Sequence, residues 1–364
     1  MSHSVSTWSP NTLWWVLTSD CNLSCLHCYL NTSKYTWPVL SEKRWDNVLD
    51  QAAEAGIKMI FLTGGEPFLL NIERLYKLSK DHNITIIGIE TNGAILNKTL
   101  IDTFLEHNTA LYVSYDQFHK NSIGNVSKWN MLVEKNIVYL TDNEVNVYIN
   151  TVISSDTMNY ISDYYERLKS LSISGWRLIA PTRIGGAKDI DILSVDEEAN
   201  IYGIVMKLWL DDERPFQLTL GSLMTNRRDE NNILIYPEYV CQYFRSVVTM
   251  MPDGRLLPCC RYIAHPDIMR LSKSIFENEM SYQFKRSVIC EIKNLKICDV
   301  LRLPENEDCR TCPLLNVCQM GCPINAFMES GYINIREKRH CQLMRGFYSG
   351  LFKKYDCVNN HMGE

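Results

Sequence analysis

The residues of this chain with the clearest chemical potential are three cysteines near its start, in the segment Cys21-Asn-Leu-Ser-Cys25-Leu-His-Cys28. Three soft thiolates on one loop are suited to an iron–sulfur cluster. Three protein ligands on a four-iron cluster leave one iron open, and an open iron can bind a substrate or a cofactor directly. The alternative is a zinc site, which needs a fourth ligand. His27 is available for that role, but its position between two cysteines would strain a tetrahedron.

The remaining cysteines form a second group far along the chain. The sequence contains fourteen cysteines, and none lies between Cys28 and Cys241. No secretory signal segment is recognisable, so metal ligation explains the cysteines better than disulfides do. For the C-x2-C pair the alternative is a zinc ribbon. The second group begins with Cys241-x12-Gly254-x4-Cys259 and continues with Cys309, Cys312, Cys318, Cys322 and Cys341.

Polar motifs follow several apolar runs. The motif Gly64-Gly65-Glu66-Pro67 comes directly after the run 59–63. Its two glycines let the backbone approach a ligand closely, and Glu66 offers an anionic acceptor for an ammonium group. Alone, each such motif is commonly a turn or a loop. On consecutive strand ends they indicate one binding site, with the further candidates Thr91, Asn92, Ser114, Asp116 and Arg183.

Alternating strands and helices are expected to position these residues. Near-continuous apolar runs predict strands over residues 12–18, 59–63, 84–90, 110–115, 145–153 and 176–180. A 3.6-residue apolar period predicts a helix from Ser41 that stops at Gly56, and further helices near 71–81, 97–107, 126–140, 159–171 and 196–210. These six strand–helix units predict an α/β fold, a partial (β/α)6 TIM-like barrel that is open on one side. Such barrels keep their active sites at the C-terminal ends of the strands.

Composition and charge define the class of protein. The net charge is −5 and the basic residues are scattered, which disfavours a nucleic-acid partner. No run of about 18 apolar residues predicts a membrane span, so we expect a cytoplasmic protein. The predicted domains are the barrel over 1–215, a linker over 216–240, a small cysteine-rich domain over 241–345 and a C-terminal tail over 346–364.

The loop C-x3-C-x2-C, followed by an aromatic residue after the first strand of a βα barrel, resembles the signature of the radical S-adenosylmethionine (SAM) superfamily. The resemblance implies that Cys21, Cys25 and Cys28 hold a [4Fe–4S] cluster whose fourth iron is chelated by SAM. Reductive cleavage of SAM would give a 5′-deoxyadenosyl radical that abstracts hydrogen from a substrate. The implied SAM-binding residues are Tyr29, Gly64, Gly65, Glu66, Pro67, Thr91, Asn92, Ser114, Asp116 and Arg183.

The C-terminal cysteines are similar to the seven-cysteine pattern of SPASM domains, which implies two auxiliary [4Fe–4S] clusters and three clusters in total. The ligands of the distal auxiliary cluster would be Cys309, Cys312, Cys318 and Cys341. Those of the cluster nearer the active site would be Cys241, Cys259 and Cys322. Two clusters need eight ligands and the pattern gives seven. The nearer cluster therefore has either an open iron or a ligand recruited from Cys260, Cys290 or Cys298.

Cys260 separates this chain from one well-defined group of relatives. Sulfatase-maturating enzymes resemble the chain in layout but carry an aspartate directly after the equivalent of Cys259, where it acts as a base. A cysteine at that position argues against sulfatase maturation. Cys260 is then a ligand, a hydrogen-atom donor or a buried thiol, and with Asp116 it is a candidate catalytic residue.

The resemblance to full SPASM domains implies a ribosomally made peptide as substrate, which is cross-linked or otherwise modified. The alternative is a small-molecule dehydrogenase or epimerase acting on a sugar or an aminocyclitol, for which the segment 115–119 offers polar groups. The expected electron donor is of the flavodoxin or ferredoxin type. Because only twenty residues precede Cys21, a peptide would need a separate recognition protein or direct docking on the barrel.

Overall fold

The computed structural model describes residues 10–31, 37–116, 126–189, 192–221, 223–225, 246–265, 269, 274–275, 307–314, 318, 320–332 and 335–350. A ten-stranded sheet organises the fold, with the strand order β10-β9-β1-β2-β3-β4-β5-β6-β7-β8. Neighbouring strands are parallel from β9 through β1 to β7, and the two edge pairs are antiparallel. The strands are β1 (Thr12–Thr18), β2 (Met59–Gly64), β3 (Thr85–Thr91), β4 (Ala110–Ser114), β5 (Val147–Val152), β6 (Gly175–Ile179), β7 (Gln217–Leu220), β8 (Met224–Thr225), β9 (Val247–Met250) and β10 (Leu256–Leu257).

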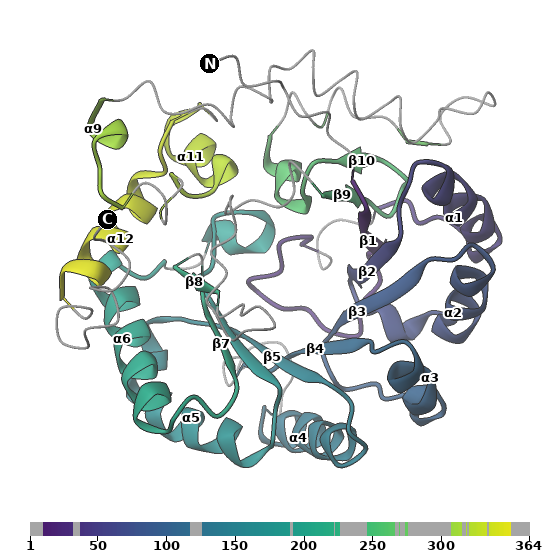
Figure 1. The fold of residues 1–364 in the computed structure, drawn as a ribbon, viewed down its shortest axis with the longest axis horizontal. Helices are drawn as coiled ribbons and strands as arrows, with labels where there is room; N and C mark the ends of the chain where they lie inside the picture. Colours follow the sequence, from purple (N-terminus) through teal and green to yellow (C-terminus); the bar gives the residue numbers. More distant parts are fainter. Residues whose placement is uncertain are drawn as a thin grey trace.

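Helices cover the outer face of the curved sheet (Figure 1). In α1 the buried residues Trp45, Val48, Leu49 and Ala52 recur at helical spacing and form one apolar face. No helix in the described part of the chain is long and apolar enough to cross a membrane. The outer helices are α1 (Trp45–Glu54), α2 (Ile72–Asp81), α3 (Ile101–Glu106), α4 (Val126–Asp142), α5 (Ile161–Ser170) and α6 (Val195–Asp211). Short 3-10 helices are η1 (Glu42–Arg44), η2 (Pro67–Leu69), η3 (Lys98–Leu100), η5 (Ser155–Asn159), η6 (Gly185–Asp189) and η8 (Cys260–Ala264).

The predicted partial barrel is confirmed, and each of the six predicted strand–helix units is present. The expectation that regular structure ends near residue 215 was wrong. β7 and β8 fall within 216–240, and β9 pairs in parallel with β1 although it lies beyond residue 241. β7 has four residues and β9 is isolated from the strand–helix alternation, so neither produces a period long enough to recognise. The domain limits themselves remain predictions.

The inner face of the barrel carries an aromatic layer made of Trp14, Phe61, Tyr112 and Tyr148. Their rings are consecutive neighbours, with centroids 3.9, 5.0 and 4.9 Å apart along the series. These side chains alternate along their strands with the residues that pack against the helices. Glycines make room for the rings, because a Cβ at position 88 would lie 2.4 Å from the Phe61 ring and one at position 175 would lie 2.6 Å from the Tyr148 ring. The aromatic layer therefore fills the lower part of the lumen.

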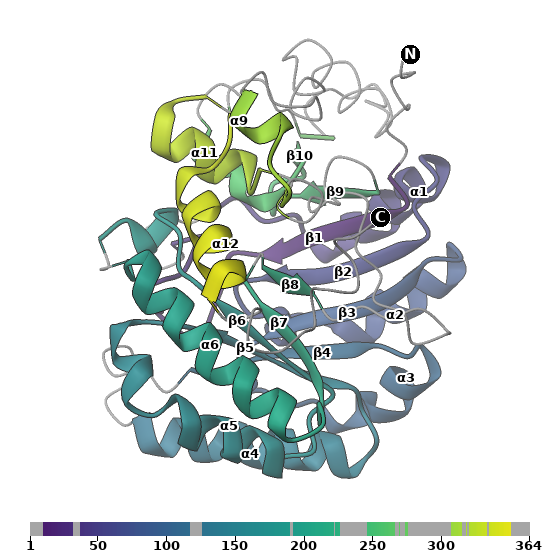
Figure 2. The same cartoon turned by 60° about the vertical axis from the view of Figure 1, so that its left-hand side comes forward.

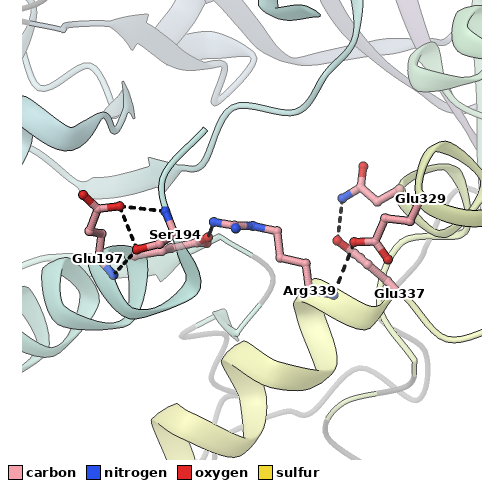
Figure 3. A network of polar contacts seen from close by, with 7 residues as sticks. Ser194, Glu197, Glu329, Glu337 and Arg339 are labelled. Atoms are coloured by element: carbon pink, nitrogen blue, oxygen red, sulfur yellow. Dashed lines mark hydrogen bonds and ion pairs between the residues drawn. The ribbon is translucent and has the colours of Figure 1, made fainter. Parts of the chain in front are cut away.

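The described C-terminal elements are α9 (Glu307–Arg310), α11 (Pro323–Ser330) and α12 (Lys338–Gly350). α12 packs along α6 (Figure 2), and its Leu343, Met344 and Phe347 are buried in the same core as the barrel helices. The Arg339 side chain reaches from α12 to the start of α6 (Figure 3), where it donates to Glu198 at 2.5 Å. The carboxylate of Glu329 accepts from the first backbone amides of α12. The C-terminal region is thus joined to the barrel by both apolar and ionic contacts.

Replacing Arg339 by alanine is expected to lower the free energy of unfolding by about 2 kcal/mol, because Glu198 is 5% exposed and would keep an unpaired charge. The melting temperature under anaerobic conditions should fall by about 4 °C. Lys207→Ala on the same helix is the control, since its ion pair with Asp211 is more than half exposed and contributes under about 0.5 kcal/mol. Equal melting temperatures for the two variants would contradict this role of Arg339.

Candidate active site

The loop that carries Cys21, Cys25 and Cys28 leaves the C-terminal end of β1, as predicted. Burial, together with the nearby Cys28, Asp116 and Cys21, raises the pKa of Cys25 to about 12. Burial also raises the pKa of Cys21, to which Glu66 and Cys28 contribute. The three thiols therefore lie close enough to influence one another's ionisation. Three soft sulfur donors on one loop fit an iron–sulfur cluster.

The motif at the end of β2 packs against the chain that leads into this loop. The Gly65 amide donates to the Thr18 carbonyl at 2.8 Å, and the Glu66 amide donates to the Asp20 carbonyl at 2.8 Å. A Cβ on Gly65 would lie 2.0 Å from the Asp20 carbonyl oxygen, so only glycine fits there. The glycines were expected to let the backbone approach a ligand. In the structure they allow two backbone segments to approach each other, which fixes Glu66 beside the cysteine loop.

A network of hydrogen bonds surrounds the carboxylate of Glu66, which is fully buried. Its two oxygens accept from the Thr91 hydroxyl at 2.9 and 3.0 Å, and one accepts from the Asn92 amide at 2.8 Å. The other accepts from the Phe68 amide at 3.1 Å. Burial raises the pKa of Glu66, and these hydrogen bonds oppose that shift. β3 thus positions the acidic group of the predicted ammonium site through two of the predicted residues, Thr91 and Asn92.

Asn92 also joins this network to the cysteine loop. Its side-chain amide donates to the Asn22 Oδ1 at 2.7 Å and lies 4.0 Å from the Cys21 sulfur. Asn22 was not among the predicted site residues. Its place between two cysteines was the available signal, because a short polar side chain there can bond across the mouth of the barrel.

Asp116, at the end of β4, is 2% exposed and is held by the protein itself. It accepts from the Val152 amide at 2.6 Å, and its other oxygen lies 3.6 Å from the His27 Nε2. Burial raises the pKa of Asp116 to about 7, against the effect of the Val152 amide. His27, weighed above as a zinc ligand, therefore faces a carboxylate. Ser114 is half-buried at the same strand end.

The connection after β6 supports the cysteine loop from the opposite side. The Gly186 amide donates to the Cys28 carbonyl at 2.8 Å. Arg183, predicted to pair with the SAM carboxylate, lies in the same connection and is exposed. Its guanidinium is therefore placed on the rim of the barrel and not within the packed interior.

The C-terminal cysteines gather in two places. Burial raises the pKa of Cys318 to about 11, with Cys341, Cys312 and Cys309 adding to the shift, so the four predicted distal ligands are neighbours. No three His, Cys, Asp or Glu side chains in the described ranges form a single-ion cage. The case for metal binding here rests on the type of donor and on its grouping.

Cys259 and Cys322 form the second group, next to the half-buried guanidinium of Arg261. Burial raises the pKa of Cys322 and Cys259 adds to it, whereas the neighbouring Arg261 lowers it. Glu337 accepts from the Cys322 amide at 2.7 Å and from the Asn325 side chain at 2.9 Å, which fixes the position of Cys322. The remaining candidates for this cluster lie outside the described residues: Cys241, Cys290 and Cys298.

Cys260 lies beside Cys259, and the hydrogen bond between their side chains lowers the pKa of Cys260. Cys260 also packs with Tyr29 on the small apolar cluster that contains Val16. The pKa of Tyr29 is raised by burial and then by the nearby Cys260 and Glu90. Cys260 therefore lies near the inner face of the barrel, beside a predicted SAM contact.

Two charged residues lie inside the barrel: Glu90, which begins the predicted motif Glu90-Thr91-Asn92-Gly93, and Arg177, which was missing from the predicted site. Glu90 accepts from the Thr63 hydroxyl at 2.7 Å, and its other oxygen lies 3.8 Å from the Arg177 Nη1. Burial raises the pKa of Glu90, while Arg177 and Thr63 lower it. The available signal was a charge within an otherwise apolar strand, which is rare unless the charge has a partner or a function.

Comparison with known proteins extends this picture. Residues 15–168 match the family described as the radical SAM superfamily. GTP 3′,8-cyclase from Synechocystis sp. is 29% identical over 147 residues, which are 38% of this chain and 43% of that protein. The chain spans about half the length of the first curated relatives that it matches. The serine-type anaerobic sulfatase-maturating enzyme of Klebsiella aerogenes is 23% identical over 83% of this chain and 77% of that protein.

Solved structures share the fold over nearly the whole chain. Native anSMEcpe with bound AdoMet and Cp18Cys peptide has a TM-score of 0.72 at 17% identity, covering 97% of this chain and 100% of that chain. Streptococcus suis SuiB bound to precursor peptide SuiA has a TM-score of 0.64 at 18% identity, covering 92% of this chain and 76% of that chain. The matched family segment contains the cysteine loop and the motif around Glu66. The segment 15–168, with this loop and this motif, therefore matches the radical SAM superfamily, and the fold of the chain is that of these solved structures.

Proposed function

We propose that this enzyme modifies a ribosomally made peptide, by forming a cross-link or by another change that begins at a carbon–hydrogen bond. The observation that carries the proposal is the gathering of the cysteine loop, the Glu66 network and Cys260 around the mouth of one open lumen. The fold of the chain is that of anSMEcpe and SuiB, whose structures were solved with bound peptides. A peptide is the substrate class that both likenesses support.

The residues of the chain have separable tasks in this proposal. Cys21, Cys25 and Cys28 would hold the cluster. Bound together, the cluster and SAM supply the 5′-deoxyadenosyl radical that removes hydrogen from the substrate. Glu66 would accept the SAM ammonium, because a carboxylate offers about four lone-pair sites and the network around it fixes its direction. The remaining predicted contacts to SAM are Tyr29, Gly64, Gly65, Pro67, Thr91, Asn92, Ser114, Asp116 and Arg183.

We further propose two auxiliary [4Fe–4S] clusters in the cysteine-rich region. Cys309, Cys312, Cys318 and Cys341 would hold the distal one, and their mutual effect on ionisation supports that set. Cys259 and Cys322, with Cys241, would hold the nearer one. Electrons would come from a flavodoxin- or ferredoxin-type donor, and a separate recognition protein remains a predicted partner for the peptide.

The alternative small-molecule substrate was predicted from the segment 115–119. Tyr115 is 3% exposed and its hydroxyl donates to Glu134 on α4, so it faces the helices and is not offered to a ligand. Asp116 is engaged by Val152 and His27. Residues 117–119 lie outside the described residues. The described part of this segment therefore gives no support to a sugar site.

The test is anaerobic turnover with SAM, dithionite and the peptide encoded by a short reading frame beside the gene. The expected result is a change in the mass of the peptide together with transfer of deuterium from a labelled peptide into 5′-deoxyadenosine. Conversion of a hexose or an aminocyclitol under the same conditions, with the peptide unchanged, would overturn the proposal.

A further inference from the structure

The barrel interior contains a polar layer whose members are neither proposed metal ligands nor proposed SAM contacts, although Tyr29 lies beside two of them, Thr63 and Glu90. Each of the four members of this layer lies on the inner face of its strand, two residues beyond a residue at the level of the aromatic layer. Those residues are the ring-bearing Phe61 and Tyr148 and the glycines beside them, Gly88 and Gly175. Two residues of strand advance about 7 Å. Two residues further along β2 and β3 are Gly65 and Asn92, at the proposed SAM site. The polar layer thus lies between the aromatic layer and the cofactor, and consists of Thr63, Glu90, Asn150 and Arg177.

The centre of this layer is a charge pair with unused bonding capacity. Glu90 and Arg177 lie 3.8 Å apart, too far for a hydrogen bond, and their side chains are 25% and 34% exposed. The Arg177 guanidinium lies over the Tyr112 ring at 5.2 Å. Among the described residues the Arg177 side chain donates no hydrogen bond, although a guanidinium carries five N–H donors. Asn150, paired in register with Arg177, has a buried Oδ1 without a described partner.

On the side away from the cofactor the lumen at this level is bordered by the aromatic layer, with the Tyr112 ring under the Arg177 guanidinium. A peptide backbone running through this space would need an exit, whereas a side chain can end there. The shape of the lumen therefore favours a single side chain that enters from the mouth.

The pair also defines which side chain fits best. A carboxylate would be attracted by Arg177 but repelled by Glu90. An ammonium group would be attracted by Glu90 but repelled by Arg177. A primary carboxamide offers a carbonyl acceptor to Arg177 and N–H donors to Glu90, and it adds no net charge to the lumen. An apolar side chain would bury the pair without any hydrogen bond, which is costly.

We propose that the polar layer is the specificity site of this enzyme, and that it binds the carboxamide of an asparagine or glutamine side chain in the peptide. The bound side chain would lie directly beneath the SAM site, so that its own carbons or those of its neighbours face the radical. This inference rests on the proposed peptide substrate and adds to it the identity of the residue that enters the barrel.

The test measures binding of four acetylated, amidated pentapeptides, Gly-Ala-Xaa-Ala-Gly, to the reconstituted holoenzyme with SAM by anaerobic calorimetry. Xaa is glutamine, glutamate, lysine or leucine. The glutamine peptide should bind at least about tenfold more tightly than the other three, as expected for a buried polar pair that rejects groups unable to satisfy it. Glu90→Gln should change the order so that the glutamate peptide binds best, because no negative charge of the protein then offsets the positive charge of Arg177. Arg177→Gln should make the lysine peptide bind best.

The matched control is Arg167→Gln, which breaks an ion pair with Glu134 between α5 and α4 on the outside of the barrel. It should leave the wild-type order of the four peptides unchanged. Equal binding of the glutamine and leucine peptides, or an unchanged order in both lumen variants, would overturn the inference and leave the peptide proposal standing. Binding of glucosamine in place of every peptide would overturn the peptide proposal and the inference together.

Discussion

Joint replacement of Cys21, Cys25 and Cys28 by alanine is expected to abolish the formation of 5′-deoxyadenosine from SAM. The three sulfurs are the grouped soft donors on the loop that leaves β1, and Glu66 and Asn92 are fixed beside them. Without these thiols no iron remains at the place where SAM is expected to bind. The measurement is 5′-deoxyadenosine formed under anaerobic conditions with dithionite, together with the iron content of the variant.

The iron content distinguishes loss of one cluster from loss of the fold. The triple variant should lose about four irons and keep those bound by the C-terminal cysteines, because Cys21, Cys25 and Cys28 affect one another's ionisation and no described C-terminal cysteine affects that of Cys21 or Cys25. The control is the triple variant Cys309→Ala, Cys312→Ala, Cys318→Ala, which should lose about four irons from the other region. Continued cleavage of SAM without Cys21, Cys25 and Cys28 would show that the cluster is held elsewhere.

The parts of the fold that sequence can predict are those with a long apolar signal. β1 was predicted over 12–18 and is found there, because seven consecutive residues are apolar, aromatic or β-branched and all but one are buried. α1 was predicted from a single apolar face, and that face is buried against the sheet. Where one face of a strand or helix contacts the core, the regular spacing of apolar residues along the sequence identifies that face.

The direction of polar side chains at strand ends is harder to predict. Glu66, Thr91 and Asn92 were expected at one site, and the structure brings them into one network. Asp116 was expected to face the ligand, yet it bonds the backbone of β5 and faces His27. Both kinds of residue follow an apolar run, so the sequence pattern is the same. The difference arises from which backbone amides are left unpaired nearby, and this depends on neighbouring strands.

The pair of Glu90 and Arg177 in the lumen could not be predicted from the sequence either. Arg177 lies in a strand predicted as buried, and Glu90 closes another, 87 residues earlier in the chain. The register pairs Glu90 with Tyr112 and Arg177 with Asn150, and only the closure of these strands around the lumen brings the two charges to 3.8 Å. A single sequence carries no record of that register. The identity of each residue was therefore visible, but not their pairing.

Cys260→Ala is expected to keep the full iron content of the protein and to lower peptide modification by at least about tenfold. Cys259 is grouped with Cys322 and the half-buried Arg261, and Cys260 contacts both the Cys259 side chain and Tyr29 near Glu90. Cys260 is thus close both to the proposed auxiliary cluster and to where a substrate side chain would lie. A thiol there is suited to donate a hydrogen atom to the substrate radical, and an electron from the proposed flavodoxin- or ferredoxin-type donor with a proton from solvent would restore the thiol. Alanine cannot donate.

Cys259→Ala is the matched control, because it removes the neighbouring thiol and should cost about four irons. Cys260→Ser keeps the size and a hydrogen-bonding group but binds hydrogen too strongly to donate it, so it should be as impaired as Cys260→Ala. Restored activity in the serine variant would assign Cys260 a packing role. Loss of about four irons from Cys260→Ala would instead make this cysteine the eighth ligand of the auxiliary clusters, and the nearer cluster would then have no open iron.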